Sequence, residues 1–258
     1  MSSRPSARPA ARRPLPKAVL FDMDDTIFDH ALTCRDALRA VRATYPYFRR
    51  LTLDTMWTEY SRLLEAEHPA VLAGTVGPDV VRAERFRRLA ALCGQSLTDR
   101  EATRLSRAYR RQYQAKRRGV SGAKGLLERL HGRTVIGIVT NNQVDEQETK
   151  LSFLGIRPLV HFMVVSEGVG VAKPDPRIFR IALDRAGAEP AQTVMVGDSW
   201  FSDVVGARSA GIRPVWFNRF HRPRPEPIPV TQVDSFRAAS RVESALAGNA
   251  GELRGPAR

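Results

Sequence analysis

Cysteine is scarce in this chain, and its scarcity excludes one class of fold. The sequence contains only two cysteines, Cys34 and Cys93, and both lie in segments with helical patterning. A small secreted domain held by disulfides carries several cysteines at regular spacings. The sequence therefore does not predict a disulfide framework, and a reducing, cytoplasmic location is the expectation.

Long apolar runs are also missing. No run of about 18 apolar residues, the length that crosses a membrane, occurs in the sequence. The first 16 residues contain no apolar segment of the kind found in secretory signals and are rich in Arg, Pro, Ser and Ala. Neither a signal peptide nor a membrane span is predicted, and we expect residues 1–16 and 249–258 to be disordered tails, the first of them basic.

Lysine is scarce too, although the chain is strongly basic. The net charge is +14, and of the 41 basic residues five are lysine and 36 are arginine. Residues 29–125 hold 19 basic and 10 acidic groups, whereas residues 126–218 hold 10 of each. Such a composition fits an arginine-rich bias on solvated faces, and it also fits a nucleic acid, an anionic membrane surface or a phosphorylated small molecule as partner. Few aromatic residues accompany the arginines, which disfavours nucleic acid.

The chain after residue 16 divides into two kinds of pattern. Residues 18–22 form an apolar run that ends in acidic residues, which is typical of a buried parallel strand. Residues 29–118 have apolar positions three and four apart, which predicts helices, with a loop over residues 69–78. Beyond residue 122, strand and helix patterns alternate, which predicts an α/β fold with a doubly wound parallel sheet. The expected strands are 134–140, 161–165, 192–197 and 213–217, and the expected helices are 124–131, 143–154, 176–186, 200–210 and 234–246.

Polar residues lie at or after the ends of four expected strands, those over 18–22, 134–140, 161–165 and 192–197. They are the segments 22–26, 140–142, 173–175 and 198–203. The carboxyl ends of parallel strands meet at one edge of the sheet, and ligands bind there in doubly wound folds. Any one segment is explained by a turn or a helix cap, but several carboxylates at one edge repel one another unless a cation neutralises them. Oxygen ligands without a His or Cys cluster favour a hard ion such as Mg²⁺.

The four motifs FDMDDT, VTNN, AKPDPRIF and GDSWFSDVVGA, in this order, resemble those of the haloacid dehalogenase-like hydrolase superfamily. The resemblance extends from about Lys17 to Asn218. It implies a Rossmann-like α/β core made of residues 17–28 and 122–248, with an α-helical cap of residues 29–121 inserted after the first motif. Such caps close over the site, exclude water and select the leaving group.

The resemblance also implies catalytic roles. Asp22 would be the nucleophile that forms an aspartyl-phosphate, and Asp24 would be the general acid and base. Thr140, the backbone N–H of Asn141 and the ammonium of Lys173 would bind the phosphoryl oxygens.

The metal site follows from the same resemblance. Mg²⁺ would be held by Asp22, the backbone carbonyl of Asp24 and Asp198. Asp203 would steer Lys173 or a metal-bound water, and Thr26 would support the turn after the first strand. Asp25, at a position where many relatives have glycine, is expected to be a surface turn residue.

The first motif also distinguishes branches of the superfamily. The dehalogenase branch generally lacks the second aspartate, so Asp24 favours hydrolysis of the phosphate monoester of a small metabolite. A phosphomutase would use the same residues. Within the cap, position alone makes Arg49, Arg50, Trp57 and Tyr60 candidates for substrate contacts. The alternative of another class is a non-catalytic protein that binds an anionic macromolecule through its basic cap and tail.

Overall fold

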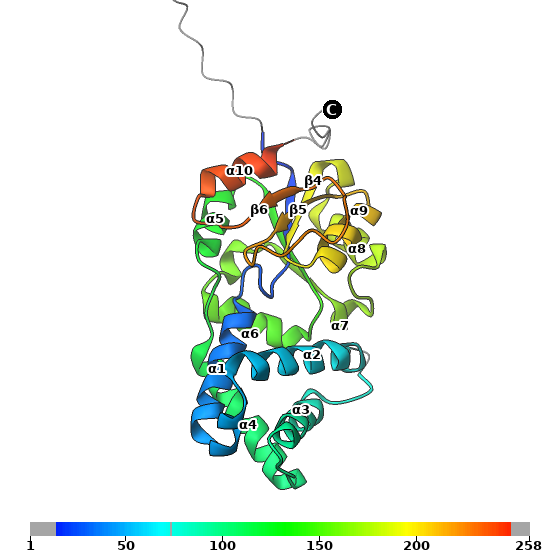
Figure 1. Cartoon of the computed structure of the whole chain (residues 1–258). Coiled ribbons are helices and arrows are strands. Elements are labelled where there is room, and N and C mark those ends of the chain that lie inside the picture. The colour runs from blue at the N-terminus through cyan, green and yellow to red at the C-terminus, as the bar shows by residue number, and fades with distance from the viewer. Residues whose placement is uncertain (1–13, 73, 249–258) are drawn as a thin grey trace, which may run out of the picture.

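The computed structural model describes residues 14–72 and 74–248, and its centre is a six-stranded parallel sheet. The strand order is β3-β2-β1-β4-β5-β6, with helices on both sides of the sheet (Figure 1). The doubly wound parallel sheet is therefore confirmed. The strands are β1 (Ala18–Phe21), β2 (Val135–Thr140), β3 (Phe162–Val165), β4 (Thr193–Gly197), β5 (Arg213–Phe217) and β6 (Thr231–Val233).

Strand β1 lies at the point where the strand order reverses. It pairs with β2 on one side and with β4 on the other. All of its residues are buried, because Val19 and Phe21 pack into the core on one face of the sheet and Leu20 packs into the core on the other. The segment after Phe21 therefore emerges between the ends of β2 and β4, where doubly wound sheets bind ligands.

The helices that accompany the sheet end largely where the sequence predicts. Gly155 and Gly187 adopt left-handed φ values of 61° and 57° at the C-caps of α6 and α8, as expected for glycine at that position. The helical segments of this part are α5 (Ala123–Leu130), α6 (Val144–Leu154), η2 (Arg157–Leu159), α7 (Ser166–Val169), α8 (Pro176–Ala186), η3 (Pro190–Gln192), η4 (Trp200–Val205), α9 (Gly206–Ser209) and α10 (Ala239–Ala247).

A group of helices between β1 and α5 lies beside the carboxyl ends of the strands (Figure 1). We call this group the helical insertion; it consists of α1 (His30–Thr44), η1 (Pro46–Arg50), α2 (Leu53–Leu72), α3 (Pro78–Leu92) and α4 (Asp99–Lys116). The rings of Tyr60, Phe86 and Tyr109 pack together in it with centroid distances of 5.1–5.7 Å. These rings belong to the hydrophobic cluster that also contains Val19 and Phe21 of β1, so the insertion packs continuously onto one face of the sheet.

The start of α4 agrees with the prediction from sequence, whereas the end of α2 does not. Thr98 caps α4, and Glu101 completes the predicted capping box. The expected loop from Pro69 was wrong, because α2 continues through Pro69 to Leu72. Pro69 lies in the last turn of α2, where a missing N–H and a bent axis disturb few further helical hydrogen bonds.

The end of the chain and the segment after β4 also differ from the prediction. The expected helix over 200–210 is a π-helical turn, η4, followed by the short α9. The helix expected over 234–246 begins only at Ala239, and the short edge strand β6 precedes it. Strand β6 has only three residues, too few for an alternation of apolar and polar positions to be recognised in the sequence. The tails expected at 1–16 and 249–258 lie outside the described residues, except for Pro14–Pro16.

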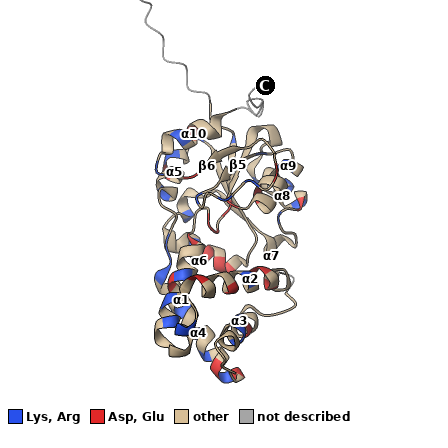
Figure 2. Cartoon of the chain, viewed as in Figure 1, with Lys and Arg blue, Asp and Glu red and all other residues tan. Residues whose placement is uncertain are grey.

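Charged residues are spread over both parts of the molecule (Figure 2), and α4 has a basic face of arginines at helical spacing. This face is exposed, as expected for a solvated row at helical spacing, and comprises Arg100, Arg104, Arg107 and Arg111. Both cysteines are buried free thiols. Among the helices of the described ranges, none combines the length and the apolar character that a membrane crossing requires.

Two glycines provide a matched test of packing near β4. A Cβ on Gly197 would lie 2.2 Å from Asp203 Oδ2, whereas a Cβ on Gly125, in the exposed part of α5, would meet nothing within 4 Å. We expect Gly197→Ala to lower the free energy of unfolding by about 2 kcal/mol or more through overpacking. Gly125→Ala should raise it by about 0.5–1 kcal/mol through helix propensity. Urea unfolding measures both, and equal stability of the Gly197 variant and the wild type would refute the close approach.

Candidate active site

Lys173 joins two carboxylates at the carboxyl edge of the sheet. Its Nζ lies 2.7 Å from Asp22 Oδ1 and 2.6 Å from Asp203 Oδ1. Asp22 follows β1, Asp203 lies in η4 after β4, and Lys173 lies in the loop before α8. All three side chains are buried. The fold thus brings together residues of three predicted motifs, although 151 positions separate Asp22 from Lys173.

The protonation of this cluster is set by burial and by mutual attraction. Burial, together with the charge of Asp203, raises the pKa of Asp22 to about 7 against the opposing effect of Lys173. Burial lowers the pKa of Lys173, but Asp203 and Asp22 outweigh it and raise that pKa above its usual range. Lys173 therefore carries a full charge at neutral pH and is placed to neutralise an anion beside Asp22.

A third carboxylate makes the site negative. Oxygen atoms of Asp22, Asp198 and Asp203 lie within 4.8 Å of one another. Burial, followed by repulsion from Asp22, raises the pKa of Asp198 well above its usual range. Trp216 Nε1 donates to the Asp198 carbonyl at 2.9 Å and fixes this segment, while Arg222 Nη1 lies 3.6 Å from Asp198 Oδ2. One ammonium faces two buried carboxylates and the partly buried Asp198, and this all-oxygen donor set fits a hard divalent cation such as Mg²⁺.

Asp24 faces a different cation from the one that Asp22 faces. Lys150 Nζ donates to both of its carboxylate oxygens, at 2.6 and 2.9 Å, and Gln147 Nε2 donates to Asp24 Oδ2 at 3.0 Å. Burial raises the pKa of Asp24, but Lys150 and His30 outweigh it and lower that pKa below its usual range. The side chains of α6 therefore fix the position of Asp24 and hold it ionised.

The two residues after β2 lie within the same network. The Thr140 hydroxyl is buried and accepts from Gln147 Nε2 at 2.8 Å. The side chain of Asn141 exchanges two hydrogen bonds of 2.8 Å with the backbone of Lys173. The Asn141 side chain therefore ties the loop after β2 to the loop of Lys173. The backbone carbonyl of Asn141 accepts from His68 Nε2 of the helical insertion at 3.1 Å.

The turn after β1 differs from the prediction in two respects. The Thr26 hydroxyl, expected to support this turn, is buried without a hydrogen-bond partner in the part of the chain that the structure describes. Backbone bonds from Ile27 and Phe28 to the Met23 carbonyl hold the turn instead. Asp25 is no plain surface residue: at φ 62° it accepts from Ala31 N and from Arg219, at 2.8 and 2.7 Å.

Only one of the four predicted cap candidates lines the cavity at this site. Tyr60 lines it, but Arg49, Arg50 and Trp57 do not. Arg49 donates to the carbonyl of Ala43, and Arg50 donates to that of Cys93, so both are used within the insertion. The four candidates were chosen by position in the sequence, whereas the packing of the helices decides which side chains line the cavity.

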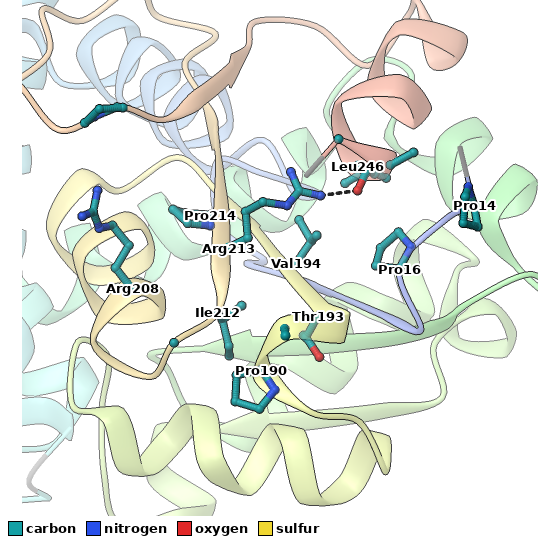
Figure 3. Close-up of a pocket in the computed structure, with 15 residues that line it drawn as sticks. Pro14, Pro16, Pro190, Thr193, Val194, Arg208, Ile212, Arg213, Pro214 and Leu246 are labelled. Atoms are coloured by element: carbon teal, nitrogen blue, oxygen red, sulfur yellow. Dashed lines mark hydrogen bonds between the residues drawn. The ribbon is translucent and has the colours of Figure 1, made fainter. Parts of the chain in front are cut away.

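The cavity occupies about 400 Å³ between the helical insertion and the core. From the core it is lined by Asp24, Asn141, Asn142, Gln143, Glu146 and Lys150, and from the insertion mainly by α2, α3 and α4. A second cavity of about 530 Å³ lies at the opposite edge of the sheet, beside Thr193 and Arg213 (Figure 3). The first residues of β4 and β5 line that cavity, so it is remote from the carboxylates.

Sequence reasoning missed the polar residues of α6. Gln147, Lys150 and Leu151 form the buried stripe of this helix, at spacings of three and four. A lysine and a glutamine on the inward stripe of a predicted helix need polar partners. That anomaly was visible in the sequence and could have directed attention to Lys150. Arg219 and Arg222, beyond β5, were missed because that strand end carries no acidic residue.

Comparison with known proteins gives relatives over most of the chain. The chain is 32% identical over 234 residues to the phosphoserine phosphatase of Thermus thermophilus, covering 87% of this chain and 90% of that protein. It is 41% identical over 111 residues to the pyrimidine 5'-nucleotidase YjjG of Escherichia coli, which amounts to 43% of this chain and 49% of that protein.

A solved structure is similar over nearly the whole chain. It is the putative HAD-hydrolase YfnB of Bacillus subtilis bound to magnesium, with a TM-score of 0.71 and 27% identity, covering 89% of this chain and 99% of that one. The family model for haloacid dehalogenase-like hydrolases matches residues 16–211. The chain therefore belongs to the haloacid dehalogenase-like hydrolase family.

Proposed function

We propose that this protein is a Mg²⁺-dependent phosphatase that hydrolyses the phosphate monoester of a small metabolite through an aspartyl-phosphate on Asp22. The observation that carries the proposal is the buried carboxylate of Asp22 beside the ammonium of Lys173, with Asp24 two residues away in a separate network. A phosphatase and a nucleotidase among the relatives support the same reaction class.

The first step is transfer of the phosphoryl group to the protein. A carboxylate oxygen of Asp22 forms a bond to phosphorus while the bond from phosphorus to the leaving oxygen breaks. Lys173, buried beside Asp22, and Thr140, whose buried hydroxyl shares the Gln147 donor with Asp24, stabilise the charge on the phosphoryl oxygens. As the substrate binds, Asp24 takes a proton from the monoanion of the phosphate ester, and it then gives this proton to the leaving oxygen, which departs as the alcohol.

The second step restores Asp22. Asp24, now ionised, takes a proton from water as the water oxygen attacks phosphorus, and inorganic phosphate leaves. The pairing with Lys150 favours this ionised state of Asp24. In the first step the negative charge of the incoming phosphate raises the pKa of Asp24 and favours its protonated state, because a like charge raises the pKa of a carboxyl group.

The metal would be held by Asp22, Asp198 and the backbone carbonyl of Asp24. When bound, Mg²⁺ would neutralise charge shared between the nucleophile and the phosphate. Asp203 accepts from Ser199 N at 3.0 Å and from Lys173, so its role is to orient these groups beside the metal ligands.

We further propose that residues 29–121 act as a cap on a core of residues 17–28 and 122–248. The contact between His68 and the Asn141 carbonyl and the ion pair between Arg110 and Glu146 both join the insertion to the core. Because these contacts lie at the cavity, movement of the insertion would open and close access to Asp24.

The metal proposal gives a pH-dependent prediction. The pKa of Asp22 is raised to about 7 and that of Asp198 is raised as well, so below pH 7 Mg²⁺ must displace protons from its ligands. The increase in Tm on adding MgCl₂ should therefore be smaller at pH 6 than at pH 8. Asp198→Asn should abolish it, whereas Asp54→Asn, an exposed change, should preserve it. An equal Mg²⁺ effect at both pH values would contradict the assignment of these ligands.

The nucleophile is tested by Asp22→Asn. An amide is a poor nucleophile, so turnover of para-nitrophenyl phosphate with Mg²⁺ should fall by at least about 10³-fold. Release of inorganic phosphate measures hydrolysis and separates it from phosphomutase activity, which would give an isomeric phosphate. Asp54→Asn serves as the control. Near wild-type turnover by the Asp22 variant would exclude the aspartyl-phosphate route.

Lys150 is tested as the residue that positions Asp24. Lys150→Met removes the donor to both Asp24 oxygens, so kcat should fall by about 10–100-fold, since general acid–base catalysis contributes at least that much, while KM changes little. Lys150→Arg should restore part of kcat. Lys124→Met, an exposed lysine of α5, is the control. If Lys150→Met lowered only the Tm and left kcat intact, Lys150 would have a structural role alone.

A further inference from the structure

The cavity holds several cations, and they differ in how far their charges are already neutralised. Arg85 donates from Nε to Glu67 at 2.6 Å, with side chains only 7% and 15% exposed. Arg110 pairs with the partly buried Glu146 of α6, and Lys150 pairs with Asp24. These three cations are thus held by carboxylates on other elements.

Arg82 differs from these cations. It lines the cavity from α3 and its side chain is 15% exposed. Its ion-pair partner is Asp79, three residues earlier on the same helix, and the Asp79 side chain is 91% exposed. Such a surface pair is worth a few tenths of a kcal/mol, because water and salt screen it. The Arg82 side chain is therefore mostly covered by protein, while the carboxylate that pairs with it remains in solvent.

The geometry points to a second anion on the substrate: we propose that Arg82 binds a carboxylate or a second phosphate on the leaving group. A guanidinium binds either group through two parallel hydrogen bonds, and it does so more strongly in a cavity than in water. This inference rests on the proposed phosphatase function and adds the class of substrate. It predicts a compound with the scissile phosphate at one end and another anionic group at the other.

The remaining groups of the cavity agree with this assignment. Glu65 also lines it, but Glu65 is exposed, so water screens its repulsion of an anion. Glu146 is neutralised by Arg110. Besides Arg82 and Asp24, the walls of the cavity include Leu64, Tyr60 and Tyr113. These side chains suit a short carbon skeleton that joins the two anionic groups.

The test compares pairs of substrates that differ in the second anion. O-phosphoserine and O-phosphoethanolamine differ in a carboxylate, and fructose 1,6-bisphosphate and fructose 6-phosphate differ in a phosphate. In one of the two pairs, the wild type should show at least tenfold higher kcat/KM for the compound that carries the second anion. The pair in which this happens identifies whether that anion is a carboxylate or a phosphate. Arg82→Gln should reduce that ratio tenfold or more, mainly through KM, and Arg82→Lys should retain part of it.

The matched control is Arg62→Gln. Arg62 forms an exposed pair with Glu59 at the same i, i+3 spacing on α2 and does not line the cavity. This variant should keep the wild-type ratio. No preference in the wild type, or a preference that survives Arg82→Gln, would overturn the inference. Absence of any hydrolysis of para-nitrophenyl phosphate with Mg²⁺ would instead overturn the proposed phosphatase function, so the two failures are distinguishable.

Discussion

The ion pairs of Lys173 with Asp22 and Asp203 hold the edge of the sheet together. Removing an ammonium and two carboxylates from water costs several kcal/mol for each ion unless all are paired. The short contacts offset this cost, and Gly197 allows them because no Cβ stands between β4 and Asp203. Since two carboxylates share one ammonium, the site remains negative before Asp198 is counted. This packing gathers oxygen ligands at one point, and the proposed Mg²⁺ site consists of the same group of carboxylates.

The same edge places two aspartates of similar sequence context in different electrostatic surroundings. Asp22 ends a buried strand and faces Lys173 together with other carboxylates, so its pKa rises towards neutrality. Asp24 follows two residues later and faces Lys150 of α6, so its pKa falls. The turn of residues 25–27 comes after both aspartates, and Asp25 fixes it through its ion pair with Arg219.

The sheet and its polar edge were predictable from sequence, because apolar runs, glycine C-caps and strand-end carboxylates are local patterns. The strands β1 to β5 and the meeting of Asp22, Lys173 and Asp203 illustrate this. The interactions that depend on packing between elements were not predictable in this way. Arg49 and Arg50 donate to backbone carbonyls within the insertion, because the side of a helix that meets the core is set by its neighbours. Lys150 was not predicted because it lies within α6, whereas the sequence argument considered the residues at the strand ends.

The net charge of +14 does not describe how individual basic side chains are neutralised. Within the insertion many arginines are neutralised nearby, as Arg85 is by Glu67. The row on α4 is exposed to solvent, where its field is screened over about 8 Å at physiological salt. Neither group therefore governs what enters the cavity. A single guanidinium that is covered by protein and weakly paired acts on a bound ligand more strongly than the many exposed charges, and Arg82 is in this position.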